Sequence, residues 1–188
     1  MGWPYSTAKM IRDFNLLATC EPLNQSAASS ELWMLLRAAG DEKPAVDRSL
    51  AKGLITARTR LDPLDAIARM RAELHENPDH LKFLLRIIPI QNRIATSLDE
   101  IKETAQSMAS RIGEDESFRI TLEKRRTDLR SREVIDAIAE GIPRRVDLEN
   151  HDWIVLIEIV GNSTGVSVIR PEGLLNVQKE RASLPAER

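Results

Sequence analysis

The sequence predicts an α+β protein of two units, in which helices pack on sheets of short strands. Apolar residues at alternate positions predict strands in both halves of the chain, and apolar residues at helical spacing predict the helices between them. A short connection near residues 91–96 joins the halves, and its length favours a fixed placement over a flexible tether. We therefore expect a first domain at residues 10–94, a second domain at 97–179 packed against it, and a frayed, charged tail at 180–188.

The first unit opens with a predicted strand and a predicted helix. Apolar residues occupy alternate positions of residues 12–20, which is the period of a strand. Residues 31–39 are compact and apolar, so we expect a helix there. Its predicted N-cap is Ser29 or Ser30, and Gly40 is expected to end it.

An extended segment, a second helix and a final strand complete the first unit. Residues 46–59 are interpreted as extended, with an irregularity at Gly53. Asp62 and Pro63 suit the start of a helix, because proline is favoured at the first helical position. Alternating apolar residues follow over residues 81–87. This succession is that of a ferredoxin-like domain, with the fourth strand drawn from within the extended segment.

The second unit begins with a clear helix signal. Ser97 and Glu100 form the pattern of a capping box, and apolar residues at helical spacing follow until Gly113. A strand with one wet face is predicted over residues 118–122. Ser131 is the predicted N-cap of the next helix.

A hairpin is predicted near the end of the second unit. Residues 153–159 are nearly all apolar, which is typical of a central strand covered on both faces. Gly161 and Asn162 are interpreted as the turn into another strand that starts near Val166. Because this glycine-containing turn opens no helix, we do not expect it to bind phosphate.

The composition excludes several classes of protein. The formal net charge of −2 and the pI of about 6.0 exclude a uniformly basic nucleic-acid binder, although a local basic face stays possible. The single cysteine, Cys20, excludes an intramolecular disulfide and a zinc site of several cysteines. We expect no membrane span, and the absence of targeting signals favours a cytoplasmic protein. Residues 1–9 are interpreted as an extension that precedes a natural start at Met10.

The sequence contains no familiar pattern of a catalytic, cofactor or metal site. The P-loop pattern and the dinucleotide-binding glycine pattern are both absent. His75 and His80 are five residues apart around a turn, which is not the spacing of a helical metal pair. Cys20 is predicted to be a buried, inert thiol. We therefore predict no cofactor, no metal and no catalytic residue.

Positive charge gathers at three places in the second unit: the end of a strand, the start of the next helix, and the segment after that helix. The residues are, in this order, Lys124, Arg125 and Arg126; Arg130 and Arg132; and Arg144 and Arg145. Because all three places belong to one strand–helix–strand unit, we predict that they converge on one face that binds phosphates. The alternative is a solvated surface, since acidic residues are interleaved. Aromatic residues make up only 4% of the chain, so base stacking is not expected.

Several pieces of the chain match a known family. In the second unit they are Lys124-Arg125-Arg126, Ser131-Arg132-Glu133, the run from Val146 to Asn150, and the turn and strand from Gly161 to Val168. This pattern, within Phe118 to Pro171, resembles the THUMP domain of proteins that assist N4-acetylation of cytidine in tRNA. The first unit is also similar at residues 12–17, 30–33 and 86–89. His151 departs from an expected proline, and residues 21–28 lack the expected basic side chains.

The resemblance implies a protein that binds tRNA, typically near its acceptor end, through a THUMP domain beside a ferredoxin-like domain. In that family a separate enzyme carries the transferase activity. The resemblance therefore implies a non-catalytic adapter that presents tRNA to a separate cytidine N4-acetyltransferase. The basic residues named above would contact RNA phosphates, and Thr164 and Ser167 would add hydroxyl contacts. Two alternatives remain open: a tRNA-modifying enzyme with an unrecognised catalytic site, and a protein-interaction module with a salt-bridged basic surface.

Overall fold

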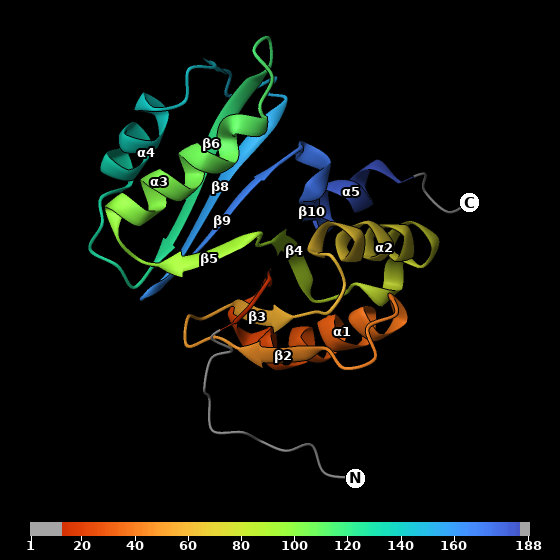
Figure 1. Cartoon of the computed structure of the whole chain (residues 1–188). Helices are drawn as coiled ribbons and strands as arrows, with labels where there is room; N and C mark the ends of the chain where they lie inside the picture. The colour runs from red at the N-terminus through yellow and green to blue at the C-terminus, as the bar shows by residue number, and fades with distance from the viewer. Residues whose placement is uncertain (1–12, 185–188) are drawn as a thin grey trace. The chain divides into compact units, whose positions relative to one another are not determined.

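The computed structural model describes residues 13–184, which form two compact units (Figure 1). One unit consists of the chain up to Ile88 together with the segment from Leu175 onward, and the other runs from Pro89 to Leu174. The predicted extension at residues 1–9 and the last four residues of the predicted tail lie outside the described residues. No helix within residues 13–184 is long and apolar enough to cross a membrane.

The first unit is built around a five-stranded sheet in the order β10-β4-β1-β3-β2. Its elements are β1 (Leu16–Cys20), η1 (Pro22–Asn24), α1 (Gln25–Ala38), β2 (Ala45–Arg48), β3 (Leu54–Arg58), α2 (Pro63–Glu76), η2 (Pro78–His80), β4 (Leu84–Pro89), β10 (Leu175–Asn176) and α5 (Val177–Ser183). Strand β3 pairs antiparallel with β1 and with β2. Without β10, the succession βαββαβ in the order β4-β1-β3-β2 is that of a ferredoxin-like domain, as the sequence predicted.

The extended segment of the sequence is a hairpin that turns at Gly53. The φ angle of this glycine is +73°, a backbone conformation that side chains disfavour. A Cβ atom there would lie 2.6 Å from the carbonyl oxygen of Cys20. The irregularity predicted at Gly53 is therefore confirmed, and it divides the segment into strands β2 and β3.

Helix α1 starts six residues before the predicted position. The prediction placed its start at Glu31, with Ser29 or Ser30 as the N-cap, but the helix begins at Gln25. Both serines lie inside the helix, where their hydroxyl groups donate to the carbonyl oxygens of Gln25 and Ser26. The first turns contain no large apolar residue, so the helical period of the sequence becomes visible only later.

The C-terminal segment returns to the first unit. Leu175 of β10 pairs with Ile87 of β4, and Arg71 Nε donates to both carboxylate oxygens of Glu180 at 2.8 and 3.0 Å. The units thus differ from the predicted boundaries at 94, 97 and 179, and helix α5 occupies part of the predicted tail. A two-residue strand that pairs with a distant segment leaves no local periodicity, which is why the sequence did not reveal it.

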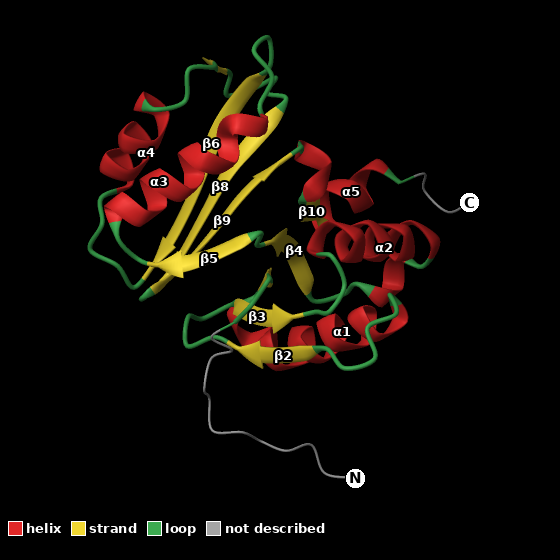
Figure 2. Cartoon of the chain, in the orientation of Figure 1, coloured by secondary structure: helices red, strands yellow, loops and turns green. Residues whose placement is uncertain are grey.

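The second unit has a five-stranded sheet in the order β5-β9-β8-β6-β7, with helices α3 and α4 on one face (Figure 2). Its elements are β5 (Asn92–Ala95), α3 (Leu98–Met108), η3 (Ala109–Arg111), β6 (Ser117–Arg125), α4 (Ser131–Glu140), β7 (Arg145–Val146), β8 (Trp153–Val160), β9 (Ser163–Ile169) and η4 (Pro171–Gly173). Strand β5 occupies the segment that was interpreted as a connection. The buried strand and the hairpin predicted at residues 153–169 are confirmed.

Two of the four predicted helix starts, those at Asp62 and Ser97, are confirmed by side-chain caps. The Asp62 carboxylate accepts a hydrogen bond from the backbone N–H of Leu64 at 2.9 Å. The Ser97 hydroxyl accepts one from the N–H of Glu100 at 3.2 Å. Ser131, in contrast, is the first residue inside helix α4, and the residue before it makes no side-chain cap.

Candidate nucleic-acid interface

One edge of the second sheet collects the ends of three strands and the starts of two helices. Strand β6 is parallel to β8, while β9 is antiparallel to both β8 and β5, so β5, β6 and β8 point the same way. Helix α3 follows β5 and helix α4 follows β6. The free N–H groups of both helix starts give this edge a positive potential. The edge is therefore suited to bind anionic groups.

Two backbone hydrogen bonds draw this edge together. The N–H of Thr96, just before α3, donates to the carbonyl oxygen of Asn162 at 3.1 Å. The N–H of Gly161 donates to the carbonyl oxygen of Arg125 at 2.9 Å. The turn between β8 and β9 is thus fixed between the ends of β5 and β6.

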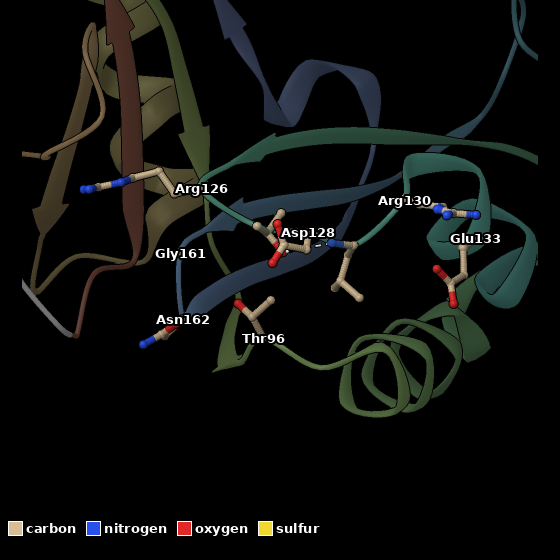
Figure 3. A pocket seen from close by; sticks show the side chains of 9 residues that line it. Thr96, Arg126, Asp128, Arg130, Glu133, Gly161 and Asn162 are labelled. Carbon is tan, nitrogen blue, oxygen red and sulfur yellow. Dashed lines mark hydrogen bonds between the residues drawn. The ribbon is translucent and has the colours of Figure 1, made fainter.

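A pocket of about 420 Å³ opens at this edge (Figure 3). It is lined by the end of β5, the loop from β6 to α4, the first turn of α4 and the turn after β8. The lining residues are Thr96, Arg126, Thr127, Asp128, Leu129, Arg130, Glu133, Gly161 and Asn162. We name this region the pocket edge, and we include in it Lys124 and Arg132, which flank the same loop.

Lys124 and Arg126 shape the start of the loop at the pocket edge in different ways, one by a hydrogen bond and the other by its backbone conformation. Both are exposed at the end of β6. The ammonium group of Lys124 donates to the carbonyl oxygen of Leu129 at 2.7 Å, which braces the loop. Arg126 has a φ angle of +59°, in the left-handed region that residues other than glycine rarely adopt. The chain turns sharply there, and the Arg126 side chain extends away from the pocket centre (Figure 3).

Arg125, predicted to bind phosphate, is instead engaged inside the protein. Its guanidinium group forms an ion pair with the Glu158 carboxylate at 3.0 Å, and Glu158 is fully buried on the central strand β8. A buried carboxylate needs a nearby positive charge, because transfer from water costs several kcal/mol per ion. We therefore interpret Arg125 as a residue that stabilises the sheet, with a side chain that is 24% exposed.

Arg130 and Arg132 lie at the start of helix α4, as predicted, and both are exposed. Arg132 approaches Asp136 at 3.5 Å, but both side chains are mostly in solvent, so this pair is weak. Among residues 13–184, the Arg130 side chain makes no hydrogen bond or ion pair. Both arginines are therefore available to phosphates at the pocket edge.

The third predicted basic cluster lies at the opposite edge of the sheet. Arg145 of β7 pairs with Ser117 at the beginning of β6, whereas Arg125 stands at its end. A strand of this length spans about 26 Å at roughly 3.3 Å per residue. The prediction that three clusters converge on one face is therefore wrong for Arg144 and Arg145. Strand β7 runs parallel to β6, so it must begin at the edge where β6 begins, and helix α4 carries the chain back to that edge.

Other interactions engage three arginines near that opposite edge, whereas Arg145 is exposed and only approaches the Asp147 carboxylate, at 4.0 Å. Arg144 Nε donates to the carbonyl oxygen of Ile112 at 2.9 Å, and Arg119 donates to that of Leu148 at 3.2 Å. Arg170 lies over the Trp153 ring, with 4.1 Å from its guanidinium carbon to the ring centroid. Burial, together with the charge of the nearby Arg119, lowers the pKa of His151 below its ordinary value.

The two hydroxyl residues predicted to touch RNA are fully buried. Thr164 Oγ1 shares a hydrogen bond of 2.9 Å with Thr96 Oγ1. Ser167 Oγ donates to the carbonyl oxygen of Pro89 at 2.8 Å and accepts from the N–H of Gln91 at 3.0 Å. Both residues connect strand β9 to the segment before α3 and do not reach a ligand at the surface.

Of the nine residues that line the pocket, the sequence predicted only Arg126 and Arg130 as binding residues. Those that it did not predict include Thr96, Asp128, Glu133 and Asn162. The two acidic residues were noted only as interleaved charges. The relative direction of the strands would have indicated these pocket residues. Residues that follow strands of common direction meet at one edge, but periodicity alone does not give strand direction.

Comparison with known proteins identifies the fold. A THUMP domain model matches residues 95–169. No curated protein sequence matches the chain significantly. TrmN from Thermus thermophilus is 18% identical with a TM-score of 0.55, over 85% of this chain and 47% of that one. A 4-thiouridine synthetase solved with RNA and ATP is 12% identical with a TM-score of 0.55, over 84% of this chain and 42% of that one.

A third structure is SMU.472, a putative methyltransferase in complex with SAH. It is 14% identical with a TM-score of 0.50, over 82% of this chain and 41% of that one. This chain therefore spans less than half the length of these three structures, and at such identities the likeness shows the fold alone.

These structures overturn the prediction of a non-catalytic adapter for a separate cytidine acetyltransferase. The fold that suggested an adapter occurs in proteins named as a synthetase and as a putative methyltransferase. The prediction took the absence of catalysis from the family resemblance, and the lack of familiar motifs within this chain agreed with it, although the matched structures are about twice as long. In this fold, residues 95–169 form a THUMP domain.

Proposed function

We propose that this chain binds tRNA within a tRNA-modifying enzyme. The observation that carries the proposal is the coincidence of the THUMP match with the pocket edge, where exposed cations and two helix starts gather. A protein with this fold has been solved as a 4-thiouridine synthetase–RNA complex. In this proposal the present chain holds the RNA, and the enzyme to which it belongs modifies that RNA.

The charges of the pocket edge support binding to an RNA backbone. Four exposed cations lie close together along the chain: Lys124 near the end of β6, Arg126 and Arg130 on the five-residue loop that follows, and Arg132 in the first turn of α4. Arginine forms paired hydrogen bonds with phosphate, and lysine adds a compact charge. Contacts of this kind position an RNA but do not read its sequence. A protein with a net charge of −2 can bind a polyanion in this way, because its positive charge is local.

The direct test is binding of purified protein to a tRNA transcript over a series of salt concentrations. Four phosphate contacts predict that the logarithm of the association constant falls with the logarithm of salt concentration with a slope of roughly −3 to −4. Saturable binding with this slope supports the proposal. Absence of binding at low salt, or a slope near zero, would contradict it.

Methyl transfer is the first reaction to assay, because one matched structure is a putative methyltransferase with SAH. The enzyme that contains this chain should transfer a methyl group from S-adenosylmethionine to tRNA, and the transfer should weaken when Arg130 is replaced by alanine. Thiolation with ATP is the second candidate, since the 4-thiouridine synthetase was solved with ATP. If the protein binds tRNA but neither methylation nor thiolation of the tRNA is detected, another modification would be indicated.

A further inference from the structure

The pocket contains two carboxylates that phosphate binding does not explain. Asp128 and Glu133 line it together with Arg126 and Arg130, and all four residues are exposed. Within residues 13–184, no ion pair or side-chain hydrogen bond joins any of these four charged groups to another group. The acidic residues therefore form no direct ion pair with the two arginines.

A carboxylate at a phosphate site is unfavourable unless the ligand offers it hydrogen-bond donors. An ionised carboxylate accepts hydrogen bonds and donates none, and it repels a phosphate nearby. RNA carries two kinds of donor beside its phosphates: the ribose hydroxyl groups and the amino or imino groups of unpaired bases. Both kinds present the same chemistry to Asp128 and Glu133.

Figure 3 shows how the charged side chains of the pocket are distributed. Arg126 and Arg130 extend to opposite sides, Asp128 and Thr96 lie between them, and Glu133 lies on the side of Arg130. Asn162, whose amide both donates and accepts, closes another part of the rim. The volume of about 420 Å³ is within the range of pockets that hold small ligands, roughly 300–1,000 Å³.

We propose that the pocket receives one unstacked ribonucleotide of the bound RNA, whose hydroxyl or amino groups donate to Asp128 and Glu133. Arg126 and Arg130 hold the phosphates on either side of that nucleotide. This proposal rests on the proposed function, and it adds a preference for the chemical class of the nucleotide that phosphate contacts alone do not provide.

The test compares three short single-stranded probes of equal length: an RNA, the DNA of the same sequence, and an RNA whose central nucleotides lack bases. Dissociation constants are measured at fixed salt for the unmodified protein and for the Asp128→Ala/Glu133→Ala variant. The matched control is Glu114→Ala/Asp115→Ala, which removes the same charge from two exposed residues before β6, at the other edge of the sheet. Thermal unfolding of each variant verifies that the fold is intact.

We expect the unmodified protein to prefer RNA to at least one of the other two probes by roughly fivefold or more, the range of one to two hydrogen bonds. The pocket variant should reduce that preference to less than about twofold, whereas the control variant should preserve it. Weak binding of DNA identifies the ribose hydroxyl as the donor. Weak binding of the RNA without bases identifies the base.

Two results would overturn the inference. One is equal binding of all three probes by the unmodified protein. The other is that the pocket variant and the control variant both bind every probe more tightly, and by the same factor. In that case the two acids would act only by general electrostatic repulsion. Either result leaves tRNA binding and its salt dependence intact, so it is distinguishable from failure of the proposed function. If tRNA itself does not bind, both proposals fail.

Discussion

The two edges of the THUMP sheet carry similar numbers of arginines but use them differently. At the opposite edge, backbone carbonyl oxygens, a carboxylate and the Trp153 ring engage Arg119, Arg144 and Arg170. At the pocket edge, Arg126 and Arg130 extend into solvent beside two helix starts. We therefore expect positive charge to bind nucleic acid only where the fold leaves it unengaged in a cluster. Arg145 tests this at the opposite edge, because it is exposed but stands apart from other unengaged arginines, 4.0 Å from Asp147.

Two neighbouring arginines, Arg125 and Arg126, should differ most strongly in their contribution to folding stability. Arg125→Ala removes the guanidinium group that lies 3.0 Å from the buried Glu158 carboxylate, which should reduce the free energy of unfolding by about 3 kcal/mol. Arg126→Ala changes an exposed side chain and should alter stability by less than about 1 kcal/mol. Urea denaturation of both variants measures the difference. Equal stability of the two would show that the ion pair is not structural.

The next effect concerns RNA binding. The triple variant Lys124→Ala/Arg126→Ala/Arg130→Ala should bind tRNA roughly 100-fold more weakly near 0.1 M salt, because three phosphate contacts are lost. Arg145→Ala, at the opposite edge, serves as its control and should bind within about twofold of the unmodified protein. A filter-binding or fluorescence titration measures both. A triple variant that keeps full affinity would remove the pocket edge from the interface.

A smaller effect is expected at the start of helix α3. Ser97→Ala removes the hydroxyl that accepts from the N–H of Glu100, and it should cost about 1 kcal/mol of stability. Ser97→Asp keeps an acceptor at the N-cap and should restore stability. Thermal or urea unfolding distinguishes the two variants. If alanine and aspartate are equally stable, the cap contributes nothing at this edge.

The smallest effect is a pH dependence at the opposite edge. Because burial lowers the pKa of His151, the folded state favours the neutral imidazole. The resulting contribution to stability is present above the unfolded pKa of about 6.5 and is lost as the pH falls through the lower folded pKa. His151→Gln should therefore lose less stability than the unmodified protein between about pH 7.5 and 5.5. Urea denaturation at both pH values measures this, and equal losses would exclude a role for His151.

Local signals predicted much of the fold. The caps at Asp62 and Ser97, the turn at Gly53 and the buried strand β8 each depend on residues close in sequence. Strands β5 and β10 were missed because four and two residues are too few to show a period.

The candidate site was predictable only in part, for a related reason. Exposed arginines at the start of α4 follow from helix placement, which periodicity gives. Strand pairing across the sheet brings Arg125 to Glu158 and keeps Arg145 away from Arg125. Local sequence patterns carry no direct signal of that pairing.

RNA phosphates are proposed to bind at the pocket edge and not at the opposite edge, and one matched pair of variants distinguishes the two edges. Salt-dependent tRNA binding is measured for Arg130→Ala and Arg145→Ala, which each remove one exposed arginine from the same sheet unit. We expect the log–log slope to become about 0.9 less steep for Arg130→Ala and to stay unchanged for Arg145→Ala. Equal slopes for the two variants, or a change only for Arg145→Ala, would show that RNA phosphates do not bind at the pocket edge as proposed.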